Sequence, residues 1–330
     1  MSRYHSKSNR NYGYGKQLSY AGRNALKTTM AGQHHSIATH SERWQRFCDW
    51  AKTQDIKEAH QINNHTLKDY AGYLKARLNG QGKSIAVSTA QNRLSTCNTV
   101  LKALRGNNDI FISPAEALDA KRCHIRTEPP ELSRVKLAAA QQELYRQGHG
   151  RIAALLGLCR ELGLRSREAA LLDCQKALIQ AKENGVIDIE RGTKGGRGKS
   201  TVTSPSRVER LVPVSDTATK ALEAAVAIQN NQQENKDNLV PINQRLPDFL
   251  SAVRHNSGAV LKKHGLNNRH DLRAAYACER YQQITHHLAP VIAGKRECVK
   301  SVDRKAREAI ALVLGHQRTD VVASYLGSAR

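Results

Sequence analysis

Four short patterns in this sequence carry side chains that can bind phosphate groups or transfer protons. In chain order they are residues 163–168 (GLRSRE), 192–196 (GTKGG), 270–273 (HDLR) and 314–316 (LGH), the last followed after nine positions by Tyr325. Taken singly, each pattern has an ordinary explanation. Arg165 could simply pair with Glu168 on a helix surface, and a tyrosine near an apolar helix is usually a core residue. Their joint presence therefore matters more than any one of them.

Together, the four patterns indicate the cleavage of a phosphate diester by a side-chain nucleophile. The Tyr325 hydroxyl suits attack on phosphorus, because a covalent phosphate ester keeps the energy of the broken bond for a later resealing step. Arg165 and Arg273 carry permanent charge on planar forks, which suit the non-bridging oxygens of the transition state. Lys194, on an expected hairpin turn, could protonate the departing hydroxyl. No acidic cluster resembling a metal site accompanies these residues, so we expect a metal-free reaction.

The charge of the chain indicates a polyanionic partner. Its 52 Lys and Arg residues exceed its 29 Asp and Glu residues, which gives a net charge of +23 at neutral pH. Such an excess attracts nucleic acid or an anionic membrane surface, and charge alone does not distinguish the two. No stretch approaches the roughly 20 apolar residues that span a bilayer, and the N-terminus lacks the apolar core of a secretory signal. We therefore expect no membrane partner.

The seven cysteines are dispersed along the chain and include no C-x-x-C pair. Several lie in apolar, helix-like stretches, which favours buried free thiols over a zinc site. We accordingly expect no metal, no cofactor and a location in the reducing cytoplasm, associated with the nucleoid.

Residues 1–34 are expected to form a basic N-terminal arm. Residues 1–41 contain no Asp or Glu. This composition predicts that the segment has no core of its own, and it suits contact with DNA phosphates. The expected DNA contacts are Arg3, Lys7, Arg10 and Lys16. A disordered solubilising tail is equally consistent with the composition.

Helical periodicity begins after this arm and predicts a small helical domain over residues 35–126. Within it, Thr66 and Asp69 resemble a capping pair at the start of a helix. Residues 79–83 (NGQGK) predict a loop between two helices.

A linker over residues 127–131 is expected to separate this domain from a second one, because the paired prolines at 129 and 130 disfavour helix. Residues 132–330 then predict helices together with two short strands, 185–190 (GVIDIE) and 210–214 (RLVPV), around a Gly-rich turn. The predicted fold class is mainly α with a small antiparallel sheet, so the second domain is an α+β domain.

The ordered set GLRxxE, a hairpin TKGG, HDLR, and LGH with a tyrosine nine residues later resembles the catalytic domain of the tyrosine recombinase (phage integrase) family. The resemblance covers about residues 155–326, and the helical domain before it is similar to the family's core-binding domain. It implies a site-specific recombinase that cuts and rejoins double-stranded DNA through a 3′-phosphotyrosyl link, without metal or ATP. It also implies a homo-oligomer, a tetramer on paired DNA sites, that integrates or excises a mobile element.

By this resemblance, Arg165 and Arg273 would clamp the scissile phosphate, and Tyr325 would form the covalent link. Lys194 would protonate the leaving 5′-hydroxyl. The sequence departs from the family here, because the hairpin that follows Lys194 is long. Lys199 is therefore a rival for the role of general acid. Two basic residues of this hairpin are also expected to contact DNA: Arg197 and Lys199.

Three further residues complete the site that the resemblance implies. His270 would help to remove the proton of Tyr325 or orient the phosphate, and His316 would donate a hydrogen bond to that phosphate. Glu168 would brace the site by pairing with an arginine.

Two other departures concern regions outside this site. The stretch between Arg273 and His316 is unusually long and basic. It reads as an insertion of about one helix that contacts DNA or a neighbouring subunit, or as a surface excursion without function. The chain also ends five residues after Tyr325, so we expect neighbouring active sites to be coupled through a surface other than a C-terminal extension.

Two other functions share these features. A topoisomerase-like or telomere-resolving strand transferase would use the same cage of residues, and relaxation of supercoils without a recombination site would reveal it. The other is a DNA-binding protein that keeps the scaffold without catalysis. It would bind DNA normally while substitutions at the site have no effect.

Overall fold

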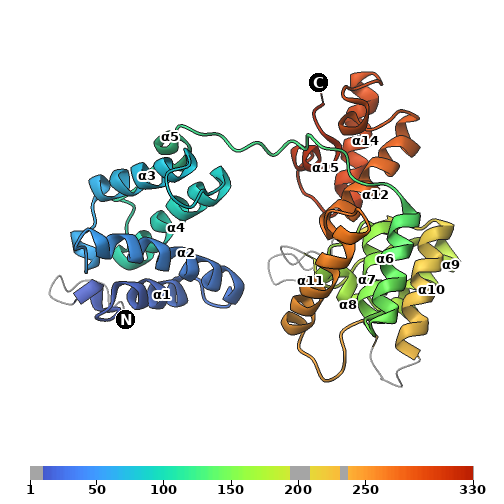
Figure 1. The fold of residues 1–330 in the computed structure, drawn as a ribbon, viewed down its shortest axis with the longest axis horizontal. Coiled ribbons are helices and arrows are strands. Elements are labelled where there is room, and N and C mark those ends of the chain that lie inside the picture. The colour runs from blue at the N-terminus through green and yellow to red at the C-terminus, as the bar shows by residue number, and fades with distance from the viewer. Residues whose placement is uncertain (1–9, 194–208, 231–236, 330) are drawn as a thin grey trace. The chain divides into compact units, whose positions relative to one another are not determined.

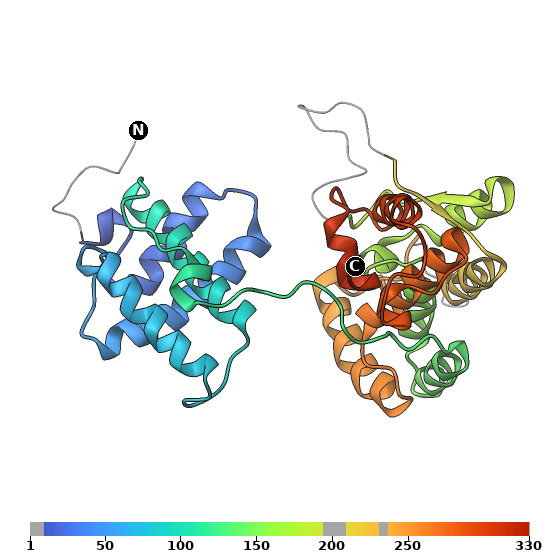
Figure 2. The same ribbon diagram turned by 90° about the horizontal axis from the view of Figure 1, so that it is seen from above.

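The computed structural model describes residues 10–193, 209–230 and 237–329, and it divides into two compact units, Met1–Cys123 and His124–Arg330 (Figure 1). The chain that joins the two units, around residues 119–133, contains neither helix nor strand and is drawn as an extended trace in both ribbon views (Figure 2). No helix within the described ranges combines the length and the apolar character needed to cross a membrane.

All the regular elements of the first unit, within its described residues, are helices. Its elements are η1 (Arg10–Gly13), α1 (Leu18–Thr29), α2 (His34–Thr53), η2 (Ala59–Gln61), α3 (Asn64–Leu78), α4 (Val87–Arg105) and α5 (Pro114–Leu118). The core is built around Trp44, whose ring stacks on Phe47 at 4.8 Å between centroids. Both side chains are fully buried, as the helical spacing of apolar residues on α2 predicts.

Helix α1 corrects the expectation that residues 1–34 form an arm without a core. Leu18, Ala21, Ala25 and Leu26 are buried and belong to the core of the first unit. The sequence prediction missed this face because several of its residues are small and the segment around them is basic. The indole Nε1 of Trp44 donates to the carbonyl of Leu18 at 3.1 Å, which joins α1 to α2.

The start of α3 differs by three residues from the expected one. Asn63 is the N-cap: its side chain accepts from the Thr66 amide at 3.0 Å, while the Thr66 hydroxyl accepts from the Asn63 amide at 3.2 Å. Thr66 therefore occupies the N3 position of a capping box rather than its N-cap. The loop predicted at 79–83 is confirmed, because α3 ends at Leu78 and α4 begins at Val87.

The second unit combines helices with a pair of short strands. Its helices are α6 (Arg134–Arg146), α7 (Gly150–Glu161), α8 (Ser166–Leu171), α9 (Cys174–Asn184), α10 (Asp216–Asn230), α11 (Leu246–Lys263), α12 (Arg269–Thr285), α13 (Pro290–Ala293), α14 (Lys300–Val313), η4 (Asp320–Val322) and α15 (Ala323–Leu326). Strands β1 (Val186–Asp188) and β2 (Leu211–Pro213) pair antiparallel, with Ile187 opposite Val212. The predicted fold class, mainly α with a small antiparallel sheet, is confirmed.

Helix α7 lies at the centre of this unit. Ten consecutive residues, from Arg151 to Arg160, are buried, so the helix is covered on all sides. Helix α12 packs against α7 on one side and against α14 and α15 on another. This central position lets α12 hold side chains of the site at a fixed place.

The long stretch between Arg273 and His316 contains most of α12, all of α13 and all of α14. Helix α14 is part of the core rather than a surface excursion: the Tyr281 hydroxyl donates to Asp303 at 2.8 Å, and both side chains are buried. Arg307, one turn later, binds the same carboxylate at 2.9 Å.

Candidate active site

Four segments that are distant in the sequence meet in the second unit. Arg165 is the N-cap of α8 and Glu168 lies in its first turn. His270 and Arg273 lie in the first turns of α12, while His316 follows α14. Tyr325 lies on the one-turn helix α15, which packs against α12.

Glu168 is fully buried among three arginines. Its carboxylate accepts from the Arg165 guanidinium at 2.7 Å and from the Arg165 backbone amide at 2.7 Å. It also lies 2.8 Å from Nη1 of Arg210 and 3.4 Å from Nη1 of Arg273. Burial would raise the pKa of Glu168, but the three positive charges outweigh it and hold that pKa below its usual value. The Arg165–Glu168 contact is therefore the centre of a buried cluster and not a solvated surface pair.

Arg273 holds the hydroxyl of Tyr325. Its Nε donates to the Tyr325 oxygen at 3.2 Å, and its two terminal nitrogens donate to the carbonyls of Gly163 and Leu314. Both side chains are buried, at 1% and 2% exposure. Burial lowers the pKa of Arg273 to about 10, so this guanidinium still carries its charge at neutral pH.

Two imidazoles lie beside the Tyr325 ring. His316 Nε2 is 3.4 Å from the Tyr325 hydroxyl, and the His270 ring meets the Tyr325 ring edge-on with centroids 5.2 Å apart. Burial and the charges of nearby arginines lower the pKa of His316 to about 4. Desolvation, followed by the charges of Arg273 and Arg126, lowers the pKa of His270 as well. At neutral pH each ring is therefore uncharged, with one nitrogen able to accept a proton.

Several solved structures share this fold over most of both chains. The XerH site-specific recombinase bound to a palindromic difH substrate matches with a TM-score of 0.59 and 16% identity, over 96% of this chain and 83% of that one. The Tn1549 transposon integrase in complex with transposon right-end DNA matches with a TM-score of 0.56 and 14% identity, over 94% and 95%. A lambda integrase dimer bound to a COC′ core site gives 0.56 and 13%, over 94% and 77%. No curated protein matches this chain in sequence.

The sequence itself supplies the second comparison. Residues 130–279 match the family described as Integrase. The second unit thus resembles an integrase domain over these residues and shares its fold with the recombinase structures above. The matched residues include the segments that carry Arg165, Glu168, His270 and Arg273, so the recognised pattern and the buried cluster coincide.

Arg210 is a member of the buried cluster around Glu168 that the sequence patterns missed. It precedes β2, is 4% exposed, and its Nε donates to the carbonyl of Val313 at 2.8 Å. Burial lowers the pKa of Arg210, although the negative charge of Glu168 opposes this. The sequence offered one signal: Arg210 directly precedes the apolar stretch LVPV. An arginine beside a buried strand usually has a partner, because buried charges are rarely left without one.

A cavity of about 240 Å³ opens beside the cluster, with Arg165, Ser166, His270 and Arg273 in its lining. All four of these side chains can donate hydrogen bonds to an anion, and the two arginines are also cationic. The second unit thus presents a recess lined by hydrogen-bond donors, and it shares Arg273 and His270 with the contacts of Tyr325.

The other predicted contact residues lie elsewhere or outside the described ranges. Lys194, Arg197 and Lys199 fall outside the described residues, and so do Arg3 and Lys7. Arg10 pairs with Glu58 at 2.6 Å, so its charge is already balanced within the first unit. Lys16 is exposed on the segment before α1.

Proposed function

We propose that this chain is a site-specific DNA recombinase in which Tyr325 attacks a DNA phosphate. The observation that carries this proposal is the Tyr325 hydroxyl held at 3.2 Å by Arg273, beside a recess that Arg165 lines. In the attack, the bond between the Tyr325 oxygen and phosphorus forms while the bond from phosphorus to the 5′-oxygen breaks. The product is a 3′-phosphotyrosyl link and a free 5′-hydroxyl, and the reverse reaction on a new strand rejoins the DNA.

The arginines stabilise the charge that develops during this step. Arg165 and Arg273 donate to the non-bridging oxygens, and their permanent charge offsets the negative charge that develops there. Each such preorganised donor contributes roughly a hundred- to a thousandfold in rate. Glu168 does not touch the phosphate. It holds Arg165 and Arg273 in place and offsets part of their mutual repulsion.

Protons move between histidines, lysine and the two hydroxyls. A neutral histidine, His316 at 3.4 Å or His270 beside the ring, accepts the proton that leaves Tyr325. Lys194 or its rival Lys199 delivers a proton to the departing 5′-oxygen. The reaction needs no metal, ATP or other cofactor in this scheme, because the bond energy is conserved in the covalent link.

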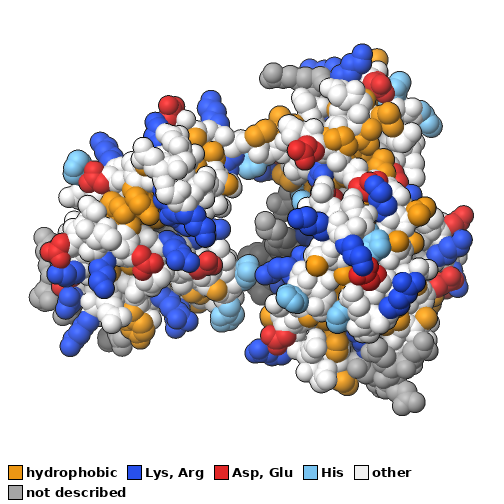
Figure 3. Space-filling view, in the orientation of Figure 1, with side chains coloured by type: hydrophobic (Ala, Val, Ile, Leu, Met, Phe, Trp, Pro, Cys, Tyr) orange, Lys and Arg blue, Asp and Glu red, His pale blue; other side chains and the backbone are white. Residues whose placement is uncertain are grey.

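Duplex DNA is the proposed partner, and a net charge of +23 supports it. Lys and Arg side chains are spread over the visible face of each unit (Figure 3). We propose that both units bind the duplex, that four copies assemble on paired sites in the cytoplasm, and that the task is to integrate or excise a mobile element. The lambda and Tn1549 integrases and XerH are seen with DNA, which supports the same partner here.

Covalent trapping tests this function. Short duplexes with a randomised core and single-strand nicks are incubated with the full chain, and protein–DNA adducts that survive SDS are collected and sequenced. The native chain should give adducts enriched in one sequence, and Tyr325→Phe should give none.

Tyr276→Phe is the matched control, because Tyr276, on α12, is buried like Tyr325 and its hydroxyl has no hydrogen-bond partner among the described residues. This variant should form adducts at the native rate. An undiminished adduct with Tyr325→Phe, or no adduct with the native chain, would overturn the proposal.

A further inference from the structure

The chain segment that enters the second unit is attached to the two helices that carry the nucleophile and the phosphate ligands. The Arg126 amide donates to the carbonyl of Ala323, the first residue of α15, at 2.9 Å. The Arg126 guanidinium donates to Asp271 in the first turn of α12 at 2.9 Å, and both side chains are largely buried. A single residue thus binds α15 two positions before Tyr325 and α12 next to His270.

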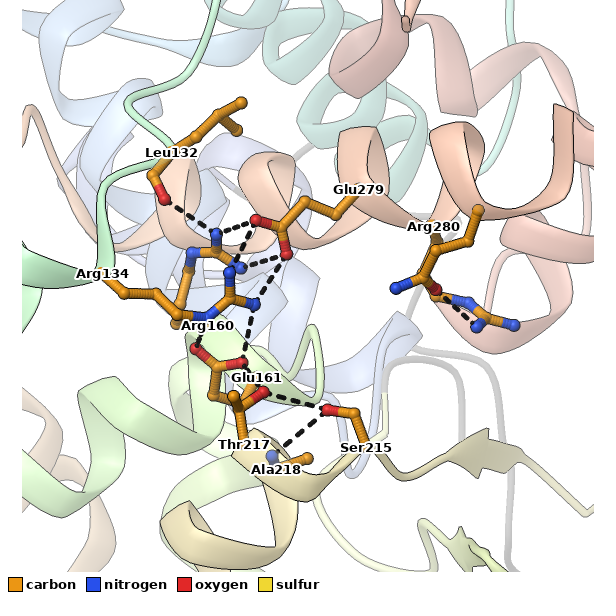
Figure 4. Close-up of polar contacts among 10 residues, drawn as sticks. Leu132, Arg134, Arg160, Glu161, Ser215, Thr217, Ala218, Glu279 and Arg280 are labelled. Atoms are coloured by element: carbon orange, nitrogen blue, oxygen red, sulfur yellow. Dashed lines mark hydrogen bonds and ion pairs between the residues drawn. The ribbon is translucent and has the colours of Figure 1, made fainter. Parts of the chain in front are cut away.

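The same segment is fixed again farther along α12. Arg160, which is 1% exposed, donates to the carbonyl of Leu132 at 3.0 Å and pairs with Glu279. Arg134 binds Glu279 at 2.8 Å and Glu161 at 2.9 Å (Figure 4). Residues 126–134 therefore form a strap along α12. Arg126 attaches the strap at Asp271, in the first turn of α12. Arg134 and the Arg160 contact with Leu132 attach it farther along, at Glu279.

The two anchors differ in what they hold. The Arg134 anchor joins the strap to the outer part of α12 and to α7, away from the phosphate recess. At the Arg126 anchor, Asp271 relies on one partner: Arg126 binds Oδ1, and Oδ2 is buried without a hydrogen bond among the described residues. Without Arg126, a buried carboxylate would lose its counter-charge, and the first turn of α12 would have to shift to hydrate it.

We propose that Arg126 is a positioning residue for DNA cleavage, which sets Tyr325 against His270 and Arg273 by joining α15 to the first turn of α12. This inference rests on the proposed function. The segment between the units then contributes to cleavage, because a displacement of Arg126 would move Tyr325 and the first turn of α12 together. A displacement of about 1 Å at a reacting group costs up to about a hundredfold in rate.

The test separates cleavage from binding, using the DNA sequence enriched by covalent trapping. Arg126→Ala should lower the single-turnover rate of adduct formation by about ten- to a hundredfold, while the Kd for the same DNA, measured with Tyr325→Phe in the background, stays within about twofold. Arg134→Ala is the matched control, because it removes an arginine from the other anchor of the same strap. Its cleavage rate should stay within about threefold of the native rate.

Two further variants exclude a merely structural role. Asp271→Asn should slow adduct formation as Arg126→Ala does, and the double variant should be no slower than either single one, because both remove the same contact. Arg126→Lys, which keeps the charge near Asp271, should recover part of the rate.

The inference is overturned if Arg126→Ala cleaves at the native rate, if Arg134→Ala is equally slow, or if the two losses add fully. A native chain that forms no adduct would instead remove the proposed function, and the inference with it.

Discussion

Glu168 places one negative charge against three arginines in the second unit, so removing that charge tests how the cluster is stabilised. In Glu168→Gln the side chain keeps its size but loses the charge that faces Arg165, Arg210 and Arg273. Arg210 and Arg273 are almost fully buried, at 4% and 1% exposure, and cannot turn to solvent. The substitution therefore leaves buried positive charges without their counter-charge.

The expected cost follows from this burial. Removing one partner of a buried ion pair costs about 3–5 kcal/mol, and the amide oxygen of glutamine can still accept one hydrogen bond, so we expect the lower end, about 3 kcal/mol. For a unit of roughly 200 residues, each kcal/mol shifts Tm by about 2–4 °C. The Tm of the second unit should thus fall by about 6–12 °C.

Calorimetry of the full chain measures this shift. Glu161→Gln is the matched control: the Glu161 side chain is 9% exposed, but its partner Arg134 is half-exposed and can turn to solvent, so we expect a cost of about 1 kcal/mol. Added phosphate should stabilise Glu168→Gln more than the native chain, because the uncompensated arginines bind an anion more strongly. An unchanged Tm, or an equal loss in Glu161→Gln, would refute the argument that Glu168 balances a buried cationic cluster.

Three other predictions concern different parts of the molecule. Arg210→Gln should lower the Tm of the second unit and slow adduct formation while leaving the Kd for DNA unchanged, since Arg210 touches Glu168 and not the recess; a weaker Kd with a native rate would contradict this. The pKa of His316 is about 4 in the folded chain against 6.5 in a free side chain, so the unfolded chain binds more protons between these values and stability falls as pH drops from about 6.5 to 4. His316→Asn should show a smaller fall in Tm over that range, and an equal fall would count against it. Trp44→Ala removes a fully buried ring and should cost the first unit about 3–5 kcal/mol in urea unfolding, without moving the transition of the second unit.

The sequence was sufficient to find most of the cluster, because the site residues lie in short local patterns. Arg165 and Glu168 are three positions apart at the start of one helix, and His270 and Arg273 are three apart at the start of another. Such spacings survive in the sequence as recognisable motifs. The hairpin was also predictable, since alternation of apolar residues and a Gly-rich turn are local signals.

Residues that act through long-range contacts could not be predicted in the same way. Arg210 meets Glu168 across 42 positions and Arg126 meets Asp271 across 145. No local pattern marks either contact, because each forms only when distant segments pack together. Arg210, before β2, meets α8, and Arg126 meets α12. Helix α1 was missed for a different reason: its buried face is made largely of small residues, and the basic residues around it dominated the composition.

The central claim is that Tyr325 becomes linked to DNA, and peptide mapping of the trapped adduct tests it most directly. Trypsin releases residues 319–330 after Arg318 as a peptide in which Tyr325 is the one tyrosine. After nuclease digestion of the adduct, tandem mass spectrometry should find this peptide carrying a nucleotide through its 3′-phosphate on Tyr325. A nucleotide on any other residue, or a link through a 5′-phosphate, would contradict the mechanism.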